Sequence, residues 1–354
     1  MPVCPNKYVS SLVAYVPGEQ PRGSGFIKLN TNENPYPPSP SVTKALSEIG
    51  KDGMHLNKYP DPWANELRKK YAEIINFSDT SIIVGNGSDE ILRMIFEAFA
   101  TEGDTLVVAD PTYVLYETLA SMFGCKTVRY PLSTEDFTLP EAFYGAEGKI
   151  LILPNPNPPY GICYGLETLE RIAAAKPERL VVFDEAYIDF TENPRGALDL
   201  ALRYDNVMVT RTFSKGWSLA GGRIGFACMN PALFESMAKV KDSYNVNKMS
   251  QVAASAALDS AEAQRENNGR IVALRSEIAE QLRKRGFTMP PSNGNFVFAR
   301  GNNAPELYRQ LKEHKVLVRW FDTPLLRDGL RITIGTTEEM RVFLEKLDLC
   351  LASM

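Results

Sequence analysis

The stretch LVVFDEAYIDF, residues 180–190, joins an apolar run to two consecutive carboxylates. Such a short apolar run, ending at Asp184, is typical of a strand that is buried on both faces of a sheet. Helical patterns lie between most of the apolar runs in the middle of the chain, and alternation of this kind favours an α/β fold with a mostly parallel, seven-stranded sheet between helices. The predicted strands are 81–85, 105–110, 125–130, 149–153, 180–184, 206–210 and 222–227.

The pattern changes after about residue 250. Helical patterns at 261–285, 304–314 and 337–352 surround apolar runs at 295–299, 315–320 and 330–335. This order predicts a small α+β domain, made of residues 251–354 and the N-terminal arm 1–35, beside a large domain of residues 36–250. The chain of 354 residues is long enough for two such domains.

Composition argues against several classes of protein. The net charge of −4 lacks the clustered basic face of a nucleic-acid-binding protein, and no apolar run approaches the ~18 residues of a membrane-spanning helix. The N-terminus MPVCPNKYVS does not resemble a signal peptide. Five scattered cysteines without a CxxC pair, and only two histidines, disfavour disulfides and a metal centre. We therefore expect a cytoplasmic protein that binds neither nucleic acid nor membranes.

Two charged residues follow predicted strands. Asp184 ends one strand, and Lys215 lies just beyond the next, within TRTFSKGWSLAGGRIGF at 210–226. Ligands of parallel sheets bind beyond the carboxyl ends of the strands. Taken singly, either residue is more often a solvated charge. Together they favour pyridoxal phosphate, a cofactor that needs a lysine for its aldehyde and a carboxylate for its ring nitrogen.

The stretch VGNGSDEILRMIFEAF, 84–99, is the candidate phosphate site. A strand ends at Val84, a glycine-rich turn follows, and we expect Ser88 to cap a helix. The free amides and the dipole of a helix N-terminus favour a phosphate, whereas Asp89 and Glu90 in the first turn oppose it. Taken alone, this stretch is an ordinary capped helix.

Two tyrosines are expected at the same edge of the sheet. Tyr113 belongs to DPTYVLY, 110–116, and its ring is placed to stack on a flat ligand. Tyr187 lies three residues after Asp184. As a lone motif, a tyrosine in such a position more often packs against its neighbours.

Taken together, these residues resemble the fold-type I pyridoxal-phosphate aminotransferases, and within them the histidinol-phosphate aminotransferase family. The resemblance rests on motifs that occur in the same order over nearly the whole chain. The motifs are LNTNENPYPPSP (29–40), KYPDP (58–62), GNGSDE (85–90), DPTY (110–113), FDEAYIDF (183–190), RTFSKGWSLAGGRIGF (211–226) and LRITIGT (330–336).

The resemblance implies a role for each of these residues. Lys215 forms a Schiff base with the cofactor and moves a proton, Asp184 pairs with the ring nitrogen, and Tyr187 donates to the ring hydroxyl oxygen. The remaining implied cofactor-binding residues are Tyr113 on the ring, and Ser88, Asp89, Ser214, Arg223 and Tyr59 at the phosphate. Tyr59 reaches the cofactor of the neighbouring subunit, which implies a homodimer with a shared active site.

One stretch departs from the family pattern. The family commonly has N-P-N-N-P-T-G, with the asparagine before P-T-G bonded to the ring hydroxyl oxygen, whereas this chain has NPNPPYG at 155–161. Pro158 occupies that asparagine position, and proline has no side-chain donor. We expect Asn157 to supply the bond through a small backbone shift. The alternative is that Tyr187 does so alone.

The resemblance also implies the substrate. Arg331 and Arg319 match two arginines that bind a carboxylate or a phosphate, and Tyr15 and Asn295 are further expected substrate contacts. For Arg319, the alternative is a charge on the sheet surface without a role in binding. The implied reaction belongs to histidine biosynthesis and converts L-histidinol phosphate and 2-oxoglutarate to imidazole-acetol phosphate and L-glutamate.

Other functions on related scaffolds remain open. An aromatic amino-acid aminotransferase or a threonine-phosphate decarboxylase would share the lysine, the aspartate and the arginines. A non-catalytic regulator is disfavoured because Lys215 is present and the chain ends leave no room for a DNA-binding domain. A nucleotide-binding protein is disfavoured because no GxGxxG or P-loop motif stands at a strand–helix junction.

Overall fold

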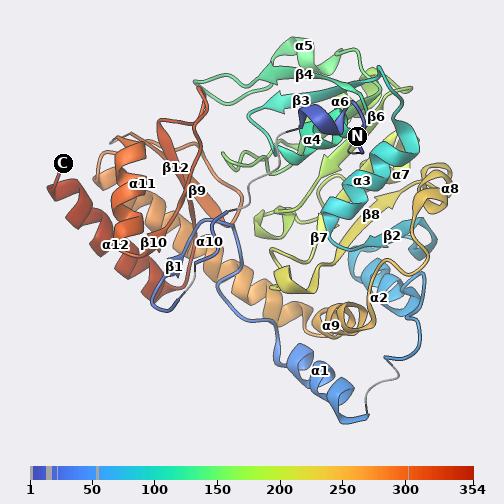
Figure 1. The fold of residues 1–354 in the computed structure, drawn as a ribbon, viewed down its shortest axis with the longest axis horizontal. Helices are drawn as coiled ribbons and strands as arrows, with labels where there is room; N and C mark the ends of the chain where they lie inside the picture. The colour runs from blue at the N-terminus through green and yellow to red at the C-terminus, as the bar shows by residue number, and fades with distance from the viewer. Residues whose placement is uncertain (1–2, 13–17, 22, 53–55, 302) are drawn as a thin grey trace.

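The computed structural model describes residues 3–12, 18–21, 23–52, 56–301 and 303–354. Its largest element is a seven-stranded sheet with the order β2-β8-β7-β6-β5-β3-β4 (Figure 1). β8 runs antiparallel to both of its neighbours, and the other neighbouring strands are parallel. The predicted α/β fold with a mostly parallel sheet is therefore confirmed.

The observed strands lie close to the predicted ones. They are β2 (Ile82–Gly85), β3 (Thr105–Asp110), β4 (Lys126–Pro131), β5 (Ile150–Pro154), β6 (Leu180–Asp184), β7 (Val207–Thr212) and β8 (Gly225–Met229). Only β8 begins as many as three residues later than predicted, because Ala220–Gly222 form a 3-10 turn and Arg223 adopts a left-handed φ of 50°.

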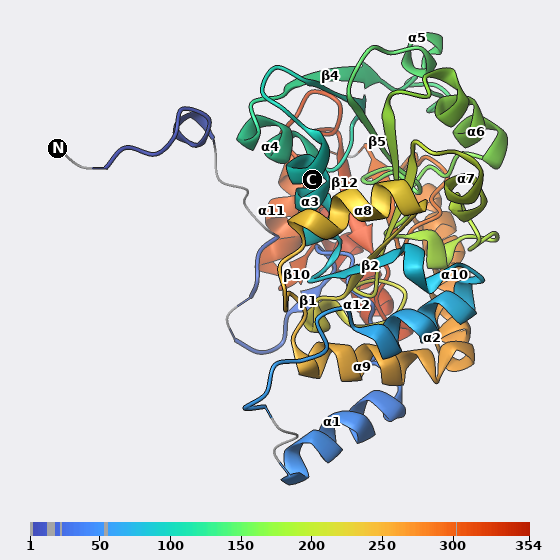
Figure 2. The same cartoon turned by 90° about the vertical axis from the view of Figure 1, so that its right-hand side faces the viewer.

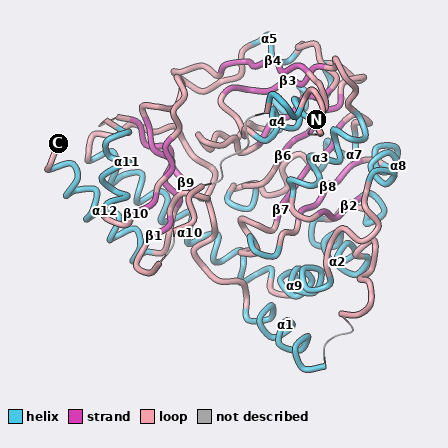
Figure 3. Tube along the Cα trace, viewed as in Figure 1, coloured by secondary structure: helices cyan, strands magenta, loops and turns pink. Residues whose placement is uncertain are grey.

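Alternating strand residues enter two separate cores, one on each face of the sheet. Figure 3 shows helices on both sides of these strands. In β3, for example, Val107 packs into one core and Val108 into the other. One face is covered by α2 (Asn65–Ile75), α5 (Glu141–Tyr144), α6 (Leu166–Ala175), α7 (Leu198–Arg203) and α9 (Lys248–Leu258), with α1 (Pro40–Asp52) packed on α9. The other face is covered by α3 (Ser88–Phe99), α4 (Leu115–Met122) and α8 (Pro231–Val240).

A third core belongs to a smaller α+β unit. Its antiparallel sheet has the order β11-β12-β9, and a parallel pair joins β1 to β10. The elements are β1 (Ile27–Lys28), β9 (Phe296–Arg300), β10 (Val316–Leu317), β11 (Arg319–Trp320), β12 (Gly329–Thr333), α10 (Ala261–Lys284), α11 (Ala304–Glu313) and α12 (Thr337–Ala352). The pairing of β1 with β10 shows that the arm preceding the large sheet crosses to this unit (Figure 2).

The division between the two units differs from the prediction at one point. The predicted boundary at residue 250 falls inside α9, and the buried residues of this helix from Ala253 to Leu258 pack in a core of the large sheet. That core therefore extends at least to residue 258. None of the helices in the described ranges is long and apolar enough to cross a membrane.

A buried ion pair ties together two strands at the carboxyl edge of the large sheet. Glu185, directly after β6, accepts hydrogen bonds from Nε and Nη2 of Arg211 in β7, at 2.9 and 2.7 Å. The Glu185 side chain is fully buried, and the Arg211 side chain is 8% exposed. The backbone N–H of Ala197 also donates to Glu185, so the carboxylate is well satisfied in a dry environment.

Replacing Glu185 by alanine should leave the Arg211 charge buried without its carboxylate. We expect Glu185→Ala to lower the free energy of unfolding by about 3–5 kcal/mol, measured by urea unfolding followed by circular dichroism. Glu141→Ala is the matched control, since it breaks a largely exposed pair with Arg171 and should change stability little. Equal losses in the two variants would contradict this assignment.

Candidate active site

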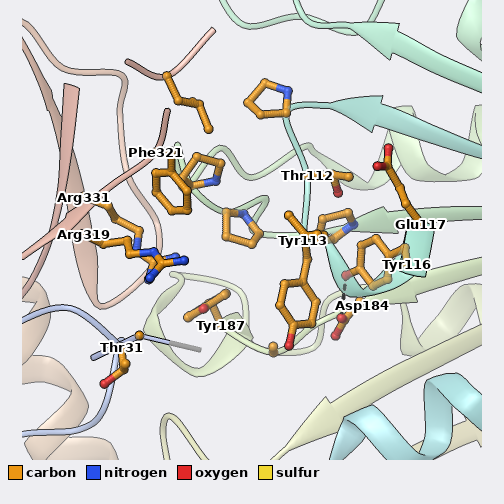
Figure 4. Close-up of a pocket in the computed structure, with 18 of the residues that line it drawn as sticks. Thr31, Thr112, Tyr113, Tyr116, Glu117, Asp184, Tyr187, Arg319, Phe321 and Arg331 are labelled. Carbon is orange, nitrogen blue, oxygen red and sulfur yellow. Dashed lines mark hydrogen bonds between the residues drawn. The ribbon is translucent and has the colours of Figure 1, made fainter. Parts of the chain in front are cut away.

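A pocket of about 710 Å³ lies at the carboxyl edge of the large sheet, between the two units (Figure 4). Parallel strands place the residues that follow them at one edge, so residues far apart in sequence meet here. The predicted site residues that line this pocket are Ser88, Asp89, Tyr113, Asp184, Tyr187, Ser214, Lys215, Arg223, Arg319 and Arg331.

Asp184 ends β6 at the floor of the pocket and is 4% exposed. Tyr116 donates to its Oδ2 at 2.6 Å, and Thr210 donates to its Oδ1 at 3.0 Å (Figure 4). Burial raises the pKa of the Asp184 carboxyl, and these two hydrogen bonds oppose the rise. The carboxylate is thus held in a fixed orientation with its remaining acceptor capacity free to face a ligand.

Tyr116 was not predicted as a site residue. It lies in α4, one helical turn after Tyr113, and is fully buried. The two rings meet edge to face, with centroids 5.5 Å apart. The recurrence of tyrosine three residues after Tyr113 in DPTYVLY is the sequence signal from which Tyr116 could have been predicted.

Lys215 lies in the turn after β7, and its Nζ donates to the carbonyl oxygen of Thr31 at 3.1 Å. Thr31 belongs to the arm that crosses between the two units. Burial, and next the positive charge of Arg331, lower the pKa of Lys215 from 10.5 to about 8. Near neutral pH, a lysine with this pKa has a far larger neutral fraction than an ordinary lysine, and the neutral amine is the nucleophile.

A cationic cradle surrounds the start of α3. Arg223 donates from Nη1 to Oγ of Ser214 and from Nη2 to Oδ2 of Asp89, at 3.2 Å in both cases. Gly87 has a φ of 84°, a backbone conformation that favours glycine, and a Cβ at this position would lie 2.5 Å from Nη2 of Arg223. The turn and the arginine therefore approach each other as closely as a small anion site requires.

The prediction that Ser88 caps α3 is wrong. Gly87 is the N-cap residue, no side chain caps the helix, and Ser88 is the first helical residue. The Glu90 carboxylate instead accepts from the backbone N–H of Asn86. Ser88 nevertheless lines the pocket, and its hydroxyl is not used as a cap.

Tyr113 and Tyr187 both line the pocket (Figure 4). The hydroxyl of Tyr113 donates to Oδ1 of Asp89 at 3.5 Å. The hydroxyl of Tyr187 accepts from Nδ2 of Asn32 at 3.0 Å, which leaves its own proton available to a ligand. Burial raises the pKa of Tyr187, so this hydroxyl remains protonated at neutral pH.

Arg319 and Arg331 lie opposite each other in the antiparallel pair β11–β12. Figure 4 shows their guanidinium groups side by side and directed into the pocket. Arg331 also donates to the carbonyl oxygen of Asn30 at 3.0 Å, and both arginines lie near the ring of Phe321. The alternative that Arg319 is only a charge on the sheet surface is wrong, because it lines the pocket.

Two predicted asparagine contacts are not found in the pocket. Asn157 is fully buried, and its Nδ2 donates to the carbonyl oxygen of Pro111 at 3.1 Å, while Pro158 and Pro159 line the pocket in its place. Asn295 is also fully buried, and its Nδ2 donates to the carbonyl oxygens of Asn32 and Glu33. Both side-chain amides donate to backbone carbonyl oxygens, so neither presents a donor to the pocket.

The last two predicted residues lie elsewhere. Tyr59 is 79% exposed, stacks on Tyr244 with ring centroids 4.3 Å apart, and is not among the residues that line the pocket. Tyr15 lies outside the described residues.

Comparison with known proteins adds an independent observation. The sequence pattern of the family "Aminotransferase class I and II" matches residues 24–347. The chain belongs to this family. Histidinol-phosphate aminotransferase of Geotalea daltonii is 43% identical over 337 residues, which are 94% of this chain and 95% of the relative.

Solved structures share the aminotransferase fold. Histidinol-phosphate aminotransferase from Sinorhizobium meliloti, crystallised in complex with pyridoxal-5'-phosphate, matches with a TM-score of 0.90 and 24% identity over 98% of this chain and 97% of that one. L-Threonine-O-3-phosphate decarboxylase from Porphyromonas gingivalis matches with a TM-score of 0.81 and 23% identity over 92% and 99% of the two chains. At these identities the likeness is one of fold.

The pocket of this aminotransferase fits pyridoxal phosphate. Asp184 offers a buried, oriented carboxylate for a protonated ring nitrogen, and Lys215 offers an amine with a lowered pKa for the aldehyde. Arg223, Ser214 and the amides at the start of α3 offer the donors that a phosphate needs. The same pocket thus carries a partner for each polar part of the cofactor.

The lowered pKa of Lys215 predicts how the rate of cofactor capture depends on pH. The amine attacks the aldehyde only when neutral, so the capture rate should rise about tenfold between pH 7 and pH 9 and level off above, because the pKa is about 8. With an ordinary lysine amine, the capture rate would keep rising up to pH ~10.5. The visible absorbance after mixing cofactor-free protein with pyridoxal phosphate measures the rate, and Lys215→Ala is the control without a band. A rate that climbs unchanged through pH 10 would contradict the assignment.

Proposed function

We propose that this chain transfers the amino group of L-histidinol phosphate to 2-oxoglutarate, giving imidazole-acetol phosphate and L-glutamate, in histidine biosynthesis. The observation that carries the proposal is the pair Arg319 and Arg331, whose guanidinium groups share one pocket with Lys215. The 43% identity to a histidinol-phosphate aminotransferase over 94% of the chain supports the same substrate.

The residues of the pocket divide the chemistry among them. Pyridoxal phosphate, when bound, supplies the electron sink that stabilises a carbanion at the substrate Cα. Lys215 holds the cofactor and then, as a neutral amine, moves the proton between Cα of the substrate and C4′ of the cofactor. Asp184 keeps the ring nitrogen protonated through its charge, and Tyr187 donates its proton to the ring hydroxyl oxygen.

We infer that Tyr187 is the donor to this oxygen, since its hydroxyl accepts from Asn32 and keeps its own proton for a ligand. Asn157 is bonded to the carbonyl oxygen of Pro111, and Pro158 has no donor. We therefore favour the alternative in which Tyr187 acts alone, with Tyr113 against the ring and Ser88, Asp89, Ser214 and Arg223 at the phosphate.

The two arginines suit a pair of substrates with different anions. L-Histidinol phosphate carries a phosphate and no carboxylate, whereas 2-oxoglutarate and glutamate carry two carboxylates. A guanidinium group binds either kind of anion through two parallel hydrogen bonds. Two such groups side by side therefore accept the substrate of each half-reaction in turn. Tyr15 stays a predicted substrate contact.

The first half-reaction tests this proposal directly. The protein loaded with pyridoxal phosphate should have a visible absorption band that bleaches when L-histidinol phosphate is added without an oxo acid. Subsequent 2-oxoglutarate should restore it. Lys215→Ala should abolish the bleaching.

Other outcomes identify the rival functions. Bleaching by phenylalanine or tyrosine, with none by L-histidinol phosphate, would make the protein an aromatic amino-acid aminotransferase. Release of carbon dioxide from threonine phosphate without an oxo acid would make it a decarboxylase.

We further infer a homodimer with shared active sites, working in the cytoplasm. Tyr59 and Tyr244 form a stacked pair on the surface and are 79% and 46% exposed. Leu56 and Met249 nearby in the sequence are also exposed, and such aromatic and apolar residues are typical of an interface core. In this arrangement Tyr59 contacts the cofactor phosphate of the partner. A reducing compartment agrees with the absence of disulfides among the described cysteines.

A complementation experiment tests the shared site. Tyr59→Ala and Lys215→Ala homodimers should each be impaired, the first in cofactor affinity and the second in all turnover. A mixed dimer contains one site with both an intact lysine and a partner tyrosine, so it should recover up to about half of the wild-type activity. A verified mixed dimer without any recovery would show that Tyr59 does not act across the interface.

A further inference from the structure

We propose that Tyr160 is a positioning residue that latches the small unit to the wall of the pocket and thereby fixes the substrate arginines. The inference rests on the proposed function, in which Arg319 and Arg331 bind the anions of the substrates. Tyr160 stands where the family pattern has a threonine, whose side chain is too short to make the same contacts.

The arginines are joined by the loop that Tyr160 contacts. Arg319 in β11 and Arg331 in β12 are direct partners in antiparallel register, and residues 321–328 connect the two strands. This loop also forms part of the pocket wall, through Phe321, Thr323, Pro324, Leu325 and Leu326. A displacement of the loop therefore moves both guanidinium groups and one wall of the substrate site together.

Tyr160 contacts this loop from the large unit. It belongs to the turn after β5, and its hydroxyl donates to the carbonyl oxygen of Leu325 at 3.2 Å. Nη2 of Arg300, in β9, donates both to the Tyr160 hydroxyl and to the same carbonyl oxygen, at 3.2 Å in each case. Nε of Arg300 lies 3.4 Å from a carboxylate oxygen of Asp328 at the far end of the loop. The Tyr160 hydroxyl, Nη2 of Arg300 and the carbonyl oxygen of Leu325 are therefore all hydrogen-bonded to one another.

The tyrosine ring is held as firmly as its hydroxyl. Tyr160 is 3% exposed and packs edge-on against Phe298 of β9 and Phe137 of the large unit, with centroids 5.3 and 5.1 Å away. Burial raises the pKa of the hydroxyl, which keeps its proton available to Leu325. The side chain thus has one rigid position between the two units.

The turn that carries Tyr160 is itself part of the site. Pro158 and Pro159 line the pocket, and each proline ring fixes its own φ. The carbonyl oxygen of Gly161 accepts from the backbone N–H of Asn293 at 2.8 Å, which gives a second bond to the small unit. The turn is therefore bonded to the small unit at Tyr160 and at Gly161. These two bonds fix the loop, and with it Arg319 and Arg331, relative to the large unit.

Tyr160→Phe tests this latch, because it removes only the hydroxyl. Tyr204→Phe is a control, since the Tyr204 hydroxyl donates to Oε1 of Glu170 at 3.0 Å within the large unit and contacts no part of the latch. We expect Tyr160→Phe to raise KM for both the amino substrate and the oxo acid about threefold to tenfold, the effect of one lost hydrogen bond, with kcat and cofactor affinity within about twofold. Tyr204→Phe should leave KM unchanged.

Hydrogen exchange supplies a readout that needs no activity. The amides of Leu326, Arg327 and Gly329 are bonded within the loop and should exchange several-fold faster in Tyr160→Phe, while the amides of β6 and β7 keep the wild-type rate. Tyr160→Thr, which also removes the ring, should enlarge both effects.

The outcomes separate the latch from the proposed reaction. If the wild-type protein does not transaminate but the loop amides respond, the latch stands and the reaction is wrong. If the wild-type protein turns over, and Tyr160→Phe matches it in KM and in loop exchange, the latch is wrong. An equal rise in exchange throughout the chain, or a loss of kcat alone, would also overturn the proposal.

Discussion

The active site depends on one topological constraint, the parallel run β7-β6-β5-β3. Four neighbouring strands with the same direction bring four chain segments to one edge of the sheet. These segments supply Lys215, Asp184, the turn with Pro158 and Pro159, and Tyr113, respectively. The cationic cradle depends on β8, which runs antiparallel to its neighbours. β8 begins beside the turn that precedes α3, so Arg223, just before β8, lies next to Asp89 at the start of this helix.

The electrostatics of the pocket follow from the depth at which its charges lie. Burial raises the pKa of Asp184 and lowers that of Lys215, so desolvation alone would push both groups toward their neutral forms. At Asp184 two hydrogen bonds from Tyr116 and Thr210 oppose this effect and favour the carboxylate. At Lys215 the positive charge of Arg331 adds to it and favours the neutral amine. Both groups are thereby favoured in their deprotonated forms, which are a charged carboxylate at Asp184 and a neutral amine at Lys215.

The sequence predicted the large sheet better than the site. Strands buried on both faces produce continuous apolar runs with few alternatives, so β3 and β6 were located to the residue. The predicted ligand contacts of Asn157 and Asn295 are not found in the pocket, because both side-chain amides donate to distant backbone carbonyls. Only the folded chain brings these carbonyls within reach.

Residues behind the site were also hard to predict. Tyr116 acts through Asp184, and its partner lies 68 positions away in the chain. The cap of α3 was wrong for a local reason, since the positive φ of Gly87 moves the first helical residue to Ser88. A tertiary contact decided the first case and a backbone angle the second, and neither can be read from the residue type.

Two arginines at directly opposed positions of neighbouring strands repel each other, so their pairing costs free energy until an anion lies between them. The repulsion pushes apart the strands that carry them unless other contacts hold the hairpin. Trp320 donates to the carbonyl oxygen of Arg327 within that hairpin, and Tyr160 and Arg300 bind the carbonyl oxygen of Leu325 at its tip. These bonds keep the cations at a fixed separation before a substrate arrives. In the proposed function, an anion bound between the two guanidinium groups relieves this repulsion, and little of the gain is spent on ordering the loop.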